Sequence, residues 1–285
     1  MIRVLAPAST ANLGPGFDAA AAALDLWNEV VVEDGSFAVV VDGEGADESP
    51  RDKTHLALRA FALVAPLEGH SFRFTNRIPF DRGLGSSAAA IALGLLAGAV
   101  VSGSTLTPDE LLSRGLELEQ HADNLAAALN GGVCLAWRDE TVHAVRVAVQ
   151  LPLAVILVVP AERTVTATSR NGLPATVSHE DAAASAGAAA LLGAAIAAGD
   201  AELLRAAFRD RLHEPYRLEN APLLRLLREE LPAAAGVTLS GSGPSVVVWA
   251  EPAQAADVAA RIAQIVPADT KVLPLRVARE GAHVT

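Results

Sequence analysis

The sequence is poor in cysteine, lysine and aromatic residues. The single cysteine, Cys134, cannot form a disulfide bond within the chain, and its place in an apolar run favours a small core residue over a catalytic thiol. Lysine occurs only at Lys53 and Lys271, and aromatic residues make up 4% of the chain. The core must therefore be built mainly from alanine, valine and leucine. A chain without disulfides fits a reducing cytoplasm, which is the predicted location.

The chain also lacks an excess of positive charge. It has 22 lysine and arginine residues against 33 aspartate and glutamate residues, which gives a formal net charge of −11. Binding to nucleic acid needs a basic face for phosphate contacts, so this charge argues against a nucleic-acid partner. An anionic small ligand remains compatible with it. Backbone amides, one or two arginines and a metal ion can hold such a ligand.

Long hydrophobic runs of the kind that mark a signal peptide or a membrane span are also lacking. Arg3 is followed by a proline and small polar residues, not by a sustained apolar block. The solidly apolar stretch from Ala88 to Val101 is shorter than the roughly 20 residues that a membrane span needs. We therefore expect a helix buried between layers, and no membrane partner.

The chain length predicts two domains, and a change in composition places their boundary near residue 150, giving residues 1–150 and 151–285. In the first half we expect strands at 2–6, 71–75, 133–137 and 142–147, a hairpin of 27–33 with 37–42, and helices at 54–64, at 86–101 and from 108 onward. In the second half we expect strands at 153–159, 237–239, 246–249 and 271–277, helices within 181–231, and a helix at 253–265. This mixed order predicts an α+β fold.

A glycine-rich motif, Pro79 to Ala90, follows a predicted strand and opens the buried helix. Gly83 and Gly85 allow the backbone to approach a bulky anion. Ser86 and Ser87 lie where free N–H groups and the helix dipole attract phosphate. The alternative is a Gly/Ser N-cap on an ordinary core helix.

The loop lacks the Gly-Lys-Ser/Thr ending of a Walker A motif, and its spacing differs from the dinucleotide-binding fingerprint. A phosphate site without the loop lysine needs another positive charge. A Mg²⁺ ion held by a serine hydroxyl and a carboxylate would supply that charge.

Two further loops accompany the glycine-rich loop. Residues 7–18 place turn formers and short polar side chains after a strand, and residues 239–245 form a second glycine-rich segment between apolar strands. Each could be an ordinary turn by itself. Their occurrence together, in this order, favours a binding site.

The three segments resemble the signature motifs of the GHMP kinases, and the resemblance extends along nearly the whole chain. It implies an ATP-dependent kinase of a small-molecule alcohol, with a two-domain α+β fold: an N-terminal half like ribosomal protein S5 domain 2 and a ferredoxin-like C-terminal half. It also implies an ATP-binding set in the glycine-rich loop, namely Pro79, Arg82, Gly83, Leu84, Gly85, Ser86, Ser87, Ala88 and Ala89.

Four local patterns are similar to the branch of this family whose members phosphorylate L-homoserine to O-phospho-L-homoserine in threonine biosynthesis. They are residues 11–18, residues 119–124 with Gly131-Gly132, Thr166 with Arg170 and Leu173-Pro174, and residues 213–217. The resemblance implies a set of substrate-binding residues, which are Asn12, Asp18, His121, Asn124, Thr166, Arg170 and Arg217.

The chemistry of that substrate suits these side chains. The guanidinium groups of Arg170 and Arg217 match the α-carboxylate, and Asp18, with Asn12 beside it, can receive the ammonium. His121 can orient the hydroxyl or the substrate backbone. The alternatives are a surface ion pair for the arginines and a turn cap for Asp18.

The resemblance makes Glu119 the Mg²⁺ carboxylate and Ser87 its hydroxyl partner, with Glu117 as the nearby alternative. Asn124 stands where relatives such as mevalonate kinase have an aspartate, and an asparagine cannot accept a proton at neutral pH. Catalysis would then rest on positioning and charge neutralisation by Ser87, Glu119 and Asn124. We expect the neighbouring Asp123 to cap or orient rather than to act as a base.

Two departures from the branch pattern stand out: Gln120 replaces a usual glycine, and His55-Leu56 replaces an Asn-Leu pair near the adenine pocket. Two other functions stay open: a GHMP kinase of a mevalonate-type or diphosphocytidyl-methylerythritol alcohol, and a non-catalytic nucleotide-sensing relative. A homodimer is common among relatives.

Overall fold

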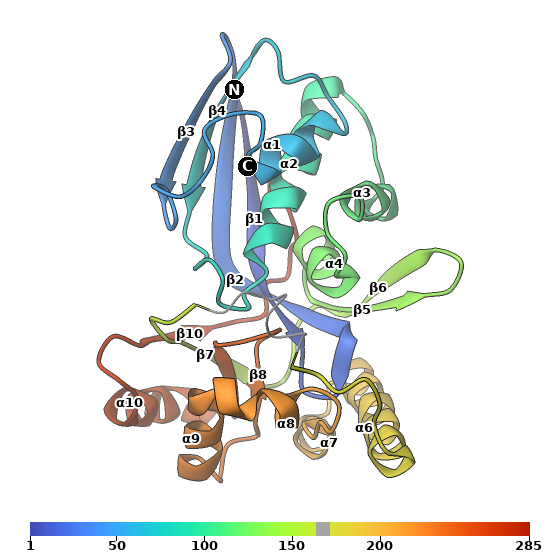
Figure 1. Cartoon of the computed structure of the whole chain (residues 1–285), viewed down its shortest axis with the longest axis vertical. Helices are drawn as coiled ribbons and strands as arrows, with labels where there is room; N and C mark the ends of the chain where they lie inside the picture. The colour runs from blue at the N-terminus through green and yellow to red at the C-terminus, as the bar shows by residue number, and fades with distance from the viewer. Residues whose placement is uncertain (164–171) are drawn as a thin grey trace.

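The computed structural model describes residues 1–163 and 172–285, and within them it has two β-sheets, each covered by helices (Figure 1). The first sheet contains β1 (Ile2–Asn12), β2 (Gly16–Asp34), β3 (Ala38–Gly43), β4 (His70–Asn76), β5 (Val133–Arg138), β6 (Val142–Ala148) and β11 (His283–Val284). The second sheet has the order β10-β7-β9-β8 and contains β7 (Ala154–Val159), β8 (Gly236–Leu239), β9 (Val246–Ala250) and β10 (Lys271–Leu275).

The helices fall into two groups. With the first sheet lie α1 (Leu56–Ala62), α2 (Ser86–Ser102), α3 (Pro108–Gly115) and α4 (Ala122–Asn130). With the second half lie α6 (His179–Ala198), α7 (Ala201–Ala207), α8 (Glu214–Arg217), α9 (Pro222–Glu230) and α10 (Ala255–Ile265). This arrangement agrees with the predicted α+β class and with most of the predicted elements.

The expected hairpin of residues 27–33 with 37–42 is wrong. β3 pairs with β4 in parallel, and β4 lies between β3 and β2. Phe72 and Phe74 of β4 are buried, whereas β3 buries only Val41. The more apolar strand therefore takes the central position, and the half-exposed β3 takes the edge.

The first strand is longer than predicted, because the prediction stopped at Pro7. In the structure β1 continues to Asn12, and its pairing with β2 shifts register between Pro7 and Ala8. Proline is tolerated in a sheet at such an irregularity. The predicted loop 7–18 is thus reduced to a tight turn at residues 13–15, and the polar side chains of Asn12 and Asp18 lie on the strand ends that flank this turn.

Helix α2 is buried along most of its length, as predicted for the apolar stretch after the glycine-rich loop. Its small residues allow close packing on α1: a Cβ added at Gly94 would lie 1.9 Å from the carbonyl oxygen of Ala57. Replacing such residues with larger ones would force the helices apart. This tight contact holds the middle of α2 against α1.

Cys134 is fully buried in β5, and its thiol donates to the carbonyl oxygens of Gly131 at 3.4 Å and Ala126 at 3.6 Å. Burial raises the pKa of Cys134 to about 12. Both findings fit the predicted role as a small core residue.

Helix α6 is long and apolar enough to cross a membrane by length and composition alone. It begins with the capping residue Ser178, whose hydroxyl accepts from the backbone N–H of Asp181 at 3.0 Å. Leu192, Ala195 and Ile196 are buried in the main core. One side of α6 is therefore used in packing within this fold.

The end of the chain returns to the first sheet. After β10, Val277 bridges to Leu24, and β11 pairs with β1. A division at residue 150 would fall between β6 and β7. β6 belongs to the first sheet, and β7 is the first strand of the second sheet. The domain division 1–150 and 151–285 stays a prediction.

Candidate active site

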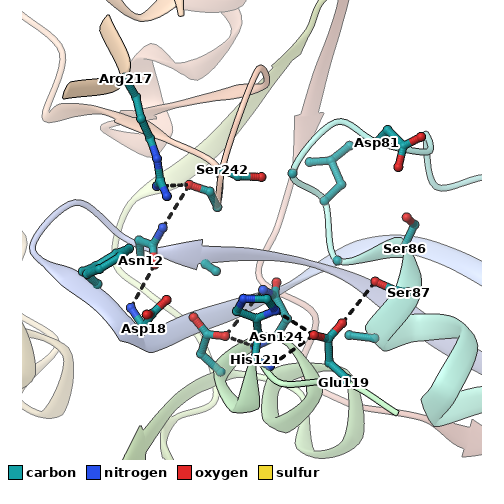
Figure 2. Close-up of a pocket in the computed structure, with 18 residues that line it drawn as sticks. Asn12, Asp18, Asp81, Ser86, Ser87, Glu119, His121, Asn124, Arg217 and Ser242 are labelled. Carbon is teal, nitrogen blue, oxygen red and sulfur yellow. Dashed lines mark hydrogen bonds and ion pairs between the residues drawn. The ribbon is translucent and has the colours of Figure 1, made fainter. Parts of the chain in front are cut away.

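A pocket forms where segments from both halves converge (Figure 2). The turn between β1 and β2, the glycine-rich loop, the start of α4, α8 and the 240–245 loop all reach it. Its lining residues are Ala11, Asn12, Phe17, Asp18, Asp81, Gly83, Leu84, Gly85, Ser86, Ser87, Ala88, Glu119, His121, Asp123, Asn124, Arg217, Gly241 and Ser242.

The glycine-rich loop turns sharply into α2. Gly85 is the N-cap of α2 with φ of 63°, and Ala89 N–H donates to its carbonyl oxygen at 2.9 Å. A Cβ at Gly85 would lie 2.0 Å from Ser9 Oγ, and one at Gly83 would lie 2.1 Å from the Ser240 carbonyl oxygen. Only glycine fits these two positions, which leaves the first N–H groups of α2 directed at the pocket, where an anion would be stabilised.

Contacts from both halves hold this loop in place. Ser9 N–H donates to the carbonyl oxygen of Leu84 at 3.1 Å, and Ser240 Oγ donates to that of Gly83 at 2.7 Å. Arg82 donates to the carbonyl oxygens of Pro160 and Ala161 at 2.9 and 2.7 Å. Arg82 therefore anchors the loop to the end of β7 rather than lining the pocket.

Ser87, Glu119 and His121 form a chain of hydrogen bonds across the pocket floor (Figure 2). Ser87 Oγ donates to Glu119 Oε2 at 3.2 Å, and Glu119 Oε1 lies 2.6 Å from His121 Nδ1 and accepts from His121 N–H at 3.1 Å. Burial would raise the pKa of Glu119, but the hydrogen bonds from His121 and Ser87 hold that pKa below its usual value. Glu119 is thus kept ionised.

This pair fits a Mg²⁺ ion that is shared with a nucleotide. Among the described residues no group of three or more His, Cys, Asp or Glu could hold a metal by itself. Mg²⁺ in nucleotide sites is usually held by one or two carboxylates and by phosphate oxygens, so a protein cage is not required. The hydroxyl of Ser87 and the ionised carboxylate of Glu119 are suitable donors at the N-terminus of α2.

Asp123 and Asn124 open α4 and face the same pocket. Asp123 is 2% exposed, and its Oδ1 accepts from Asn124 N–H at 2.7 Å. Burial, with the nearby charges of Asp18 and Glu119, raises the pKa of Asp123 to about 6. Asn124 Oδ1 accepts from Ser9 Oγ at 2.8 Å, so the amide Nδ2 is the group that it can offer as a donor.

The opposite wall is built from Asn12, Asp18 and Arg217 (Figure 2). Asn12 Oδ1 accepts from Asp18 N–H at 3.1 Å, and Asn12 Nδ2 donates to the carbonyl oxygen of Gly241 at 2.9 Å. Arg217 Nη1 donates to the same carbonyl at 3.2 Å. Asn12 and Asp18 have φ of 73° and 55°, a left-handed conformation that non-glycine residues seldom adopt outside functional sites.

Most of the sequence-predicted residues meet in this pocket. Pro79, Arg82 and Ala89 belong to the glycine-rich motif but do not line the pocket. Thr166 and Arg170 lie outside the described residues. The sequence prediction did not select Phe17, Asp81 or Ser242, although all three belong to the motifs that carried it. Their membership in those motifs could have identified them as pocket residues.

His55 does not line the pocket. Its ring stacks on Phe74 with centroids 4.3 Å apart, and burial lowers its pKa. It therefore packs α1 on β4 as a neutral side chain, at the position where the branch pattern has asparagine.

Comparison with known proteins identifies the family of this chain. The family model for the GHMP kinases N terminal domain matches residues 53–132, and that for the GHMP kinases C terminal domain matches residues 183–268. The homoserine kinase of Streptomyces coelicolor is 39% identical over 299 residues, covering 99% of this chain and 94% of that protein. The homoserine kinase of Mycobacterium tuberculosis is 42% identical over 260 residues, covering 84% and 81% of the two chains.

Solved structures give the same result. The homoserine kinase from Cytophaga hutchinsonii matches with a TM-score of 0.89 at 26% identity and covers 100% of this chain and 97% of that chain. The phosphomevalonate kinase of Streptococcus pneumoniae, at 15% identity and a TM-score of 0.74, shares the fold.

The chain therefore belongs to the GHMP kinase family, and its two-domain α+β fold is the one predicted. Within that family, its sequence is similar to homoserine kinases over nearly its whole length.

Proposed function

We propose that the chain transfers the γ-phosphoryl group of ATP to the side-chain hydroxyl of L-homoserine and produces O-phospho-L-homoserine for threonine biosynthesis. The observation that carries this proposal is the pairing of two unlike walls. A helix N-terminus with Ser87 and Glu119 suits a metal-bound phosphate, and Asp18 and Arg217 opposite it suit the ammonium and carboxylate of an amino acid.

The phosphate wall would bind the triphosphate through backbone N–H groups of residues 83–89, with Pro79 and Arg82 shaping the loop. Ser87 and Glu119 would hold the Mg²⁺ ion, which neutralises charge on the β- and γ-phosphates. The lowered pKa of Glu119 supports this role, because an ionised carboxylate is the ligand that Mg²⁺ requires.

The acceptor wall would read both charged groups of L-homoserine. Arg217, with Arg170, binds the carboxylate, and Asp18, supported by Asn12, receives the ammonium. His121 and Thr166 complete the subsite. Mevalonate lacks the ammonium group and would leave Asp18 without its partner.

Catalysis in this proposal needs no strong base. Phosphoryl transfer passes through a loose transition state, so alignment and charge neutralisation supply most of the rate. Asn124 can donate one Nδ2 hydrogen to the acceptor hydroxyl oxygen and hold it in line, because Ser9 occupies its Oδ1 and Nδ2 makes only a long contact, 3.5 Å, to Asp123 Oδ1. Asp123 supports Asn124 by accepting its backbone N–H.

The test is ADP release by the purified chain with ATP and Mg²⁺, comparing L-homoserine, mevalonate and L-serine. We expect release with homoserine alone, and its loss in Arg170→Ala. Arg73→Ala is a matched control, because Arg73 lies on β4 away from the pocket and forms a weak exposed pair with Asp42. Release with mevalonate instead would favour another GHMP substrate, and nucleotide binding without any acceptor would favour a sensing role.

The remaining parts of the proposal concern context. We propose a cytoplasmic enzyme with no nucleic-acid or membrane partner, in which residues 1–150 and 151–285 act as the two domains. A homodimer is proposed because relatives are commonly dimeric, and sedimentation of the purified chain tests it.

A further inference from the structure

A buried histidine joins the two segments that form the acceptor wall. His213 is 0% exposed and directly precedes α8. Its Nε2 lies 2.9 Å from the carbonyl oxygen of Gly14, in the turn between β1 and β2. Its Nδ1 lies 3.0 Å from Nη1 of Arg217. One imidazole ring therefore contacts both the turn that lies between Asn12 and Asp18 and the guanidinium group of Arg217.

The two partners fix the protonation of the ring. A carbonyl oxygen only accepts hydrogen bonds, so Nε2 carries the hydrogen that Gly14 receives. A guanidinium only donates, so Nδ1 presents its lone pair to Arg217. His213 is thus the neutral Nε2–H tautomer, since a second proton would point at the donor of Arg217.

Neighbouring groups hold the ring itself. It stacks on Phe17 with centroids 4.9 Å apart and an interplanar angle of 20°. Asp210 accepts from the backbone N–H groups of His213 and Glu214 at 2.8 and 2.7 Å, and its Oδ2 lies 3.7 Å from His213 Nε2. Glu214, 1% exposed, accepts from Leu239 N–H at 2.7 Å and pairs with Arg228, which fixes α8 against β8.

Two of the hydrogen-bond acceptors of Arg217 are uncharged groups. Its Nη1 donates to His213 Nδ1 and to the carbonyl oxygen of Gly241, and its guanidinium carbon lies 5.6 Å from the centroid of the Phe17 ring. Neither of these two acceptors carries a charge, so they orient the guanidinium and add no negative group that would compete with a carboxylate ligand. A carboxylate at position 213 would orient Arg217 equally well but would compete with the substrate.

We infer that His213 is a positioning residue: as a neutral acceptor it orients Arg217 and ties it to the Asn12–Asp18 turn, and so it sets selectivity for an acceptor alcohol that bears a carboxylate. This inference rests on the proposed function, because it assigns the carboxylate subsite of that reaction. It adds a residue that does not line the pocket and that acts through its contacts with Arg217, Gly14 and Phe17.

The test compares two acceptors in the intact chain, L-homoserine and 3-amino-1-propanol, which is homoserine without its carboxylate. We expect His213→Leu, which has similar volume but no acceptor, to lower the ratio of their kcat/KM values roughly 10- to 100-fold, mainly through the KM for homoserine. The KM for ATP should stay unchanged. His213→Asn places an amide oxygen near the position of Nδ1 and should keep most of the wild-type ratio.

Two controls separate positioning from a structural role. His143→Leu removes an exposed histidine on β6, and the acceptor ratio should not change. Loss of fold in His213→Leu would lower activity on both acceptors equally, and a thermal melt of each variant detects it. If a folded His213→Leu keeps the wild-type ratio, or His213→Asn loses it as fully as the leucine variant, the inference is overturned.

A second readout does not depend on activity. In chain labelled with ¹⁵N-histidine, the His213 signals should report an unprotonated Nδ1 and a protonated Nε2, and Arg217→Ala should shift the Nδ1 signal. A hydrogen on Nδ1 would refute the inference even if the leucine variant did not fold. If the wild-type chain does not phosphorylate homoserine at all, the proposed function fails first, while the tautomer measurement still decides the role of His213.

Discussion

The two walls of the pocket are built by different means. The proposed phosphate wall is formed mainly by a short continuous segment, residues 83–88, which lines the pocket together with Glu119. The acceptor wall is assembled from side chains that come from distant segments: Asn12 bonds Gly241 across 229 residues, and His213 bonds Gly14 across 199. The first wall is defined by local conformation and the second by the tertiary fold, so they should respond differently to substitution.

The largest effect is expected on the phosphate wall. Gly85→Ala places a Cβ against Ser9 Oγ at a left-handed backbone position, so the loop must shift. We expect kcat/KM for ATP to fall roughly 100- to 1000-fold, because the N–H groups of the loop lose their alignment. Steady-state kinetics at varied ATP measures this.

The matched control is Gly103→Ala at the other end of α2. Gly103 has φ of 66° but nothing within 4 Å of an added Cβ. It should lose about 1 kcal/mol of stability from the backbone conformation and no activity. Equal activity losses in both variants would mean that strain, and not alignment of the loop, explains the effect.

The next effect tests the proposed Mg²⁺ site on the phosphate wall. Glu119→Gln removes the charge of the proposed Mg²⁺ ligand but keeps its shape, and we expect kcat to fall about 100-fold with a higher Mg²⁺ requirement. Glu117→Gln, on the exposed face two residues earlier, should leave both unchanged. A Mg²⁺ titration of the two variants decides between these carboxylates, and an effect in Glu117→Gln alone would reverse the assignment.

A smaller effect is expected on the acceptor wall. Asp18→Asn should raise the KM for homoserine about 10-fold and leave the KM for ATP unchanged, because the ammonium loses a charged partner. The same change should not weaken the use of 4-hydroxybutyrate, which is homoserine without its ammonium group. A parallel loss with 4-hydroxybutyrate would show that Asp18 supports the turn and does not read the ammonium.

The last prediction concerns stability, with no change expected in the kinetic comparison of the two walls. The pKa of Asp123 is raised to about 6, so its carboxylate destabilises the folded state at neutral pH. Below about pH 4, near the ordinary value of 3.8, folded and unfolded chains are both protonated and this cost disappears. The free energy of unfolding should therefore fall as pH rises from 4 through 6.

Asp123→Asn keeps the acceptor for Asn124 N–H and removes the charge. It should stabilise the chain by up to about 3 kcal/mol at pH 8 and by almost nothing at pH 4. Urea unfolding at the two pH values measures the difference. A pH-independent difference would mean that packing, and not the buried charge, determines it.

These contrasts explain how far the sequence alone could go. The place of the glycine-rich loop in the pocket was predictable, because its residues are contiguous in the sequence. The place of Ser87 and Glu119 in the same pocket was predicted from the motifs that contain them. The pairing of β3 with β4 was missed, since strand adjacency in a sheet depends on which strand buries more surface and not on chain order. Arg82 could not be placed from sequence, because its partners are backbone carbonyls at the end of β7.

The coupling of His213 to Gly14 and Arg217 was equally out of reach. The segment 213–217 indicated that Arg217 belongs to the site, but the direction of an imidazole hydrogen bond depends on what faces it in three dimensions. For the same reason the raised pKa of Asp123 required knowing that α4 begins inside the pocket.

The burial of Cys134 has a practical consequence for labelling. With a pKa of about 12, its thiol is scarcely ionised at neutral pH and should not react with maleimide reagents. The natural chain can thus serve as its own cysteine-free background. A fluorophore attached at Asp81→Cys would report on the conformation of the glycine-rich loop. With a second fluorophore at Ala190→Cys on α6, the efficiency of energy transfer between the two would measure the distance between the two halves during turnover.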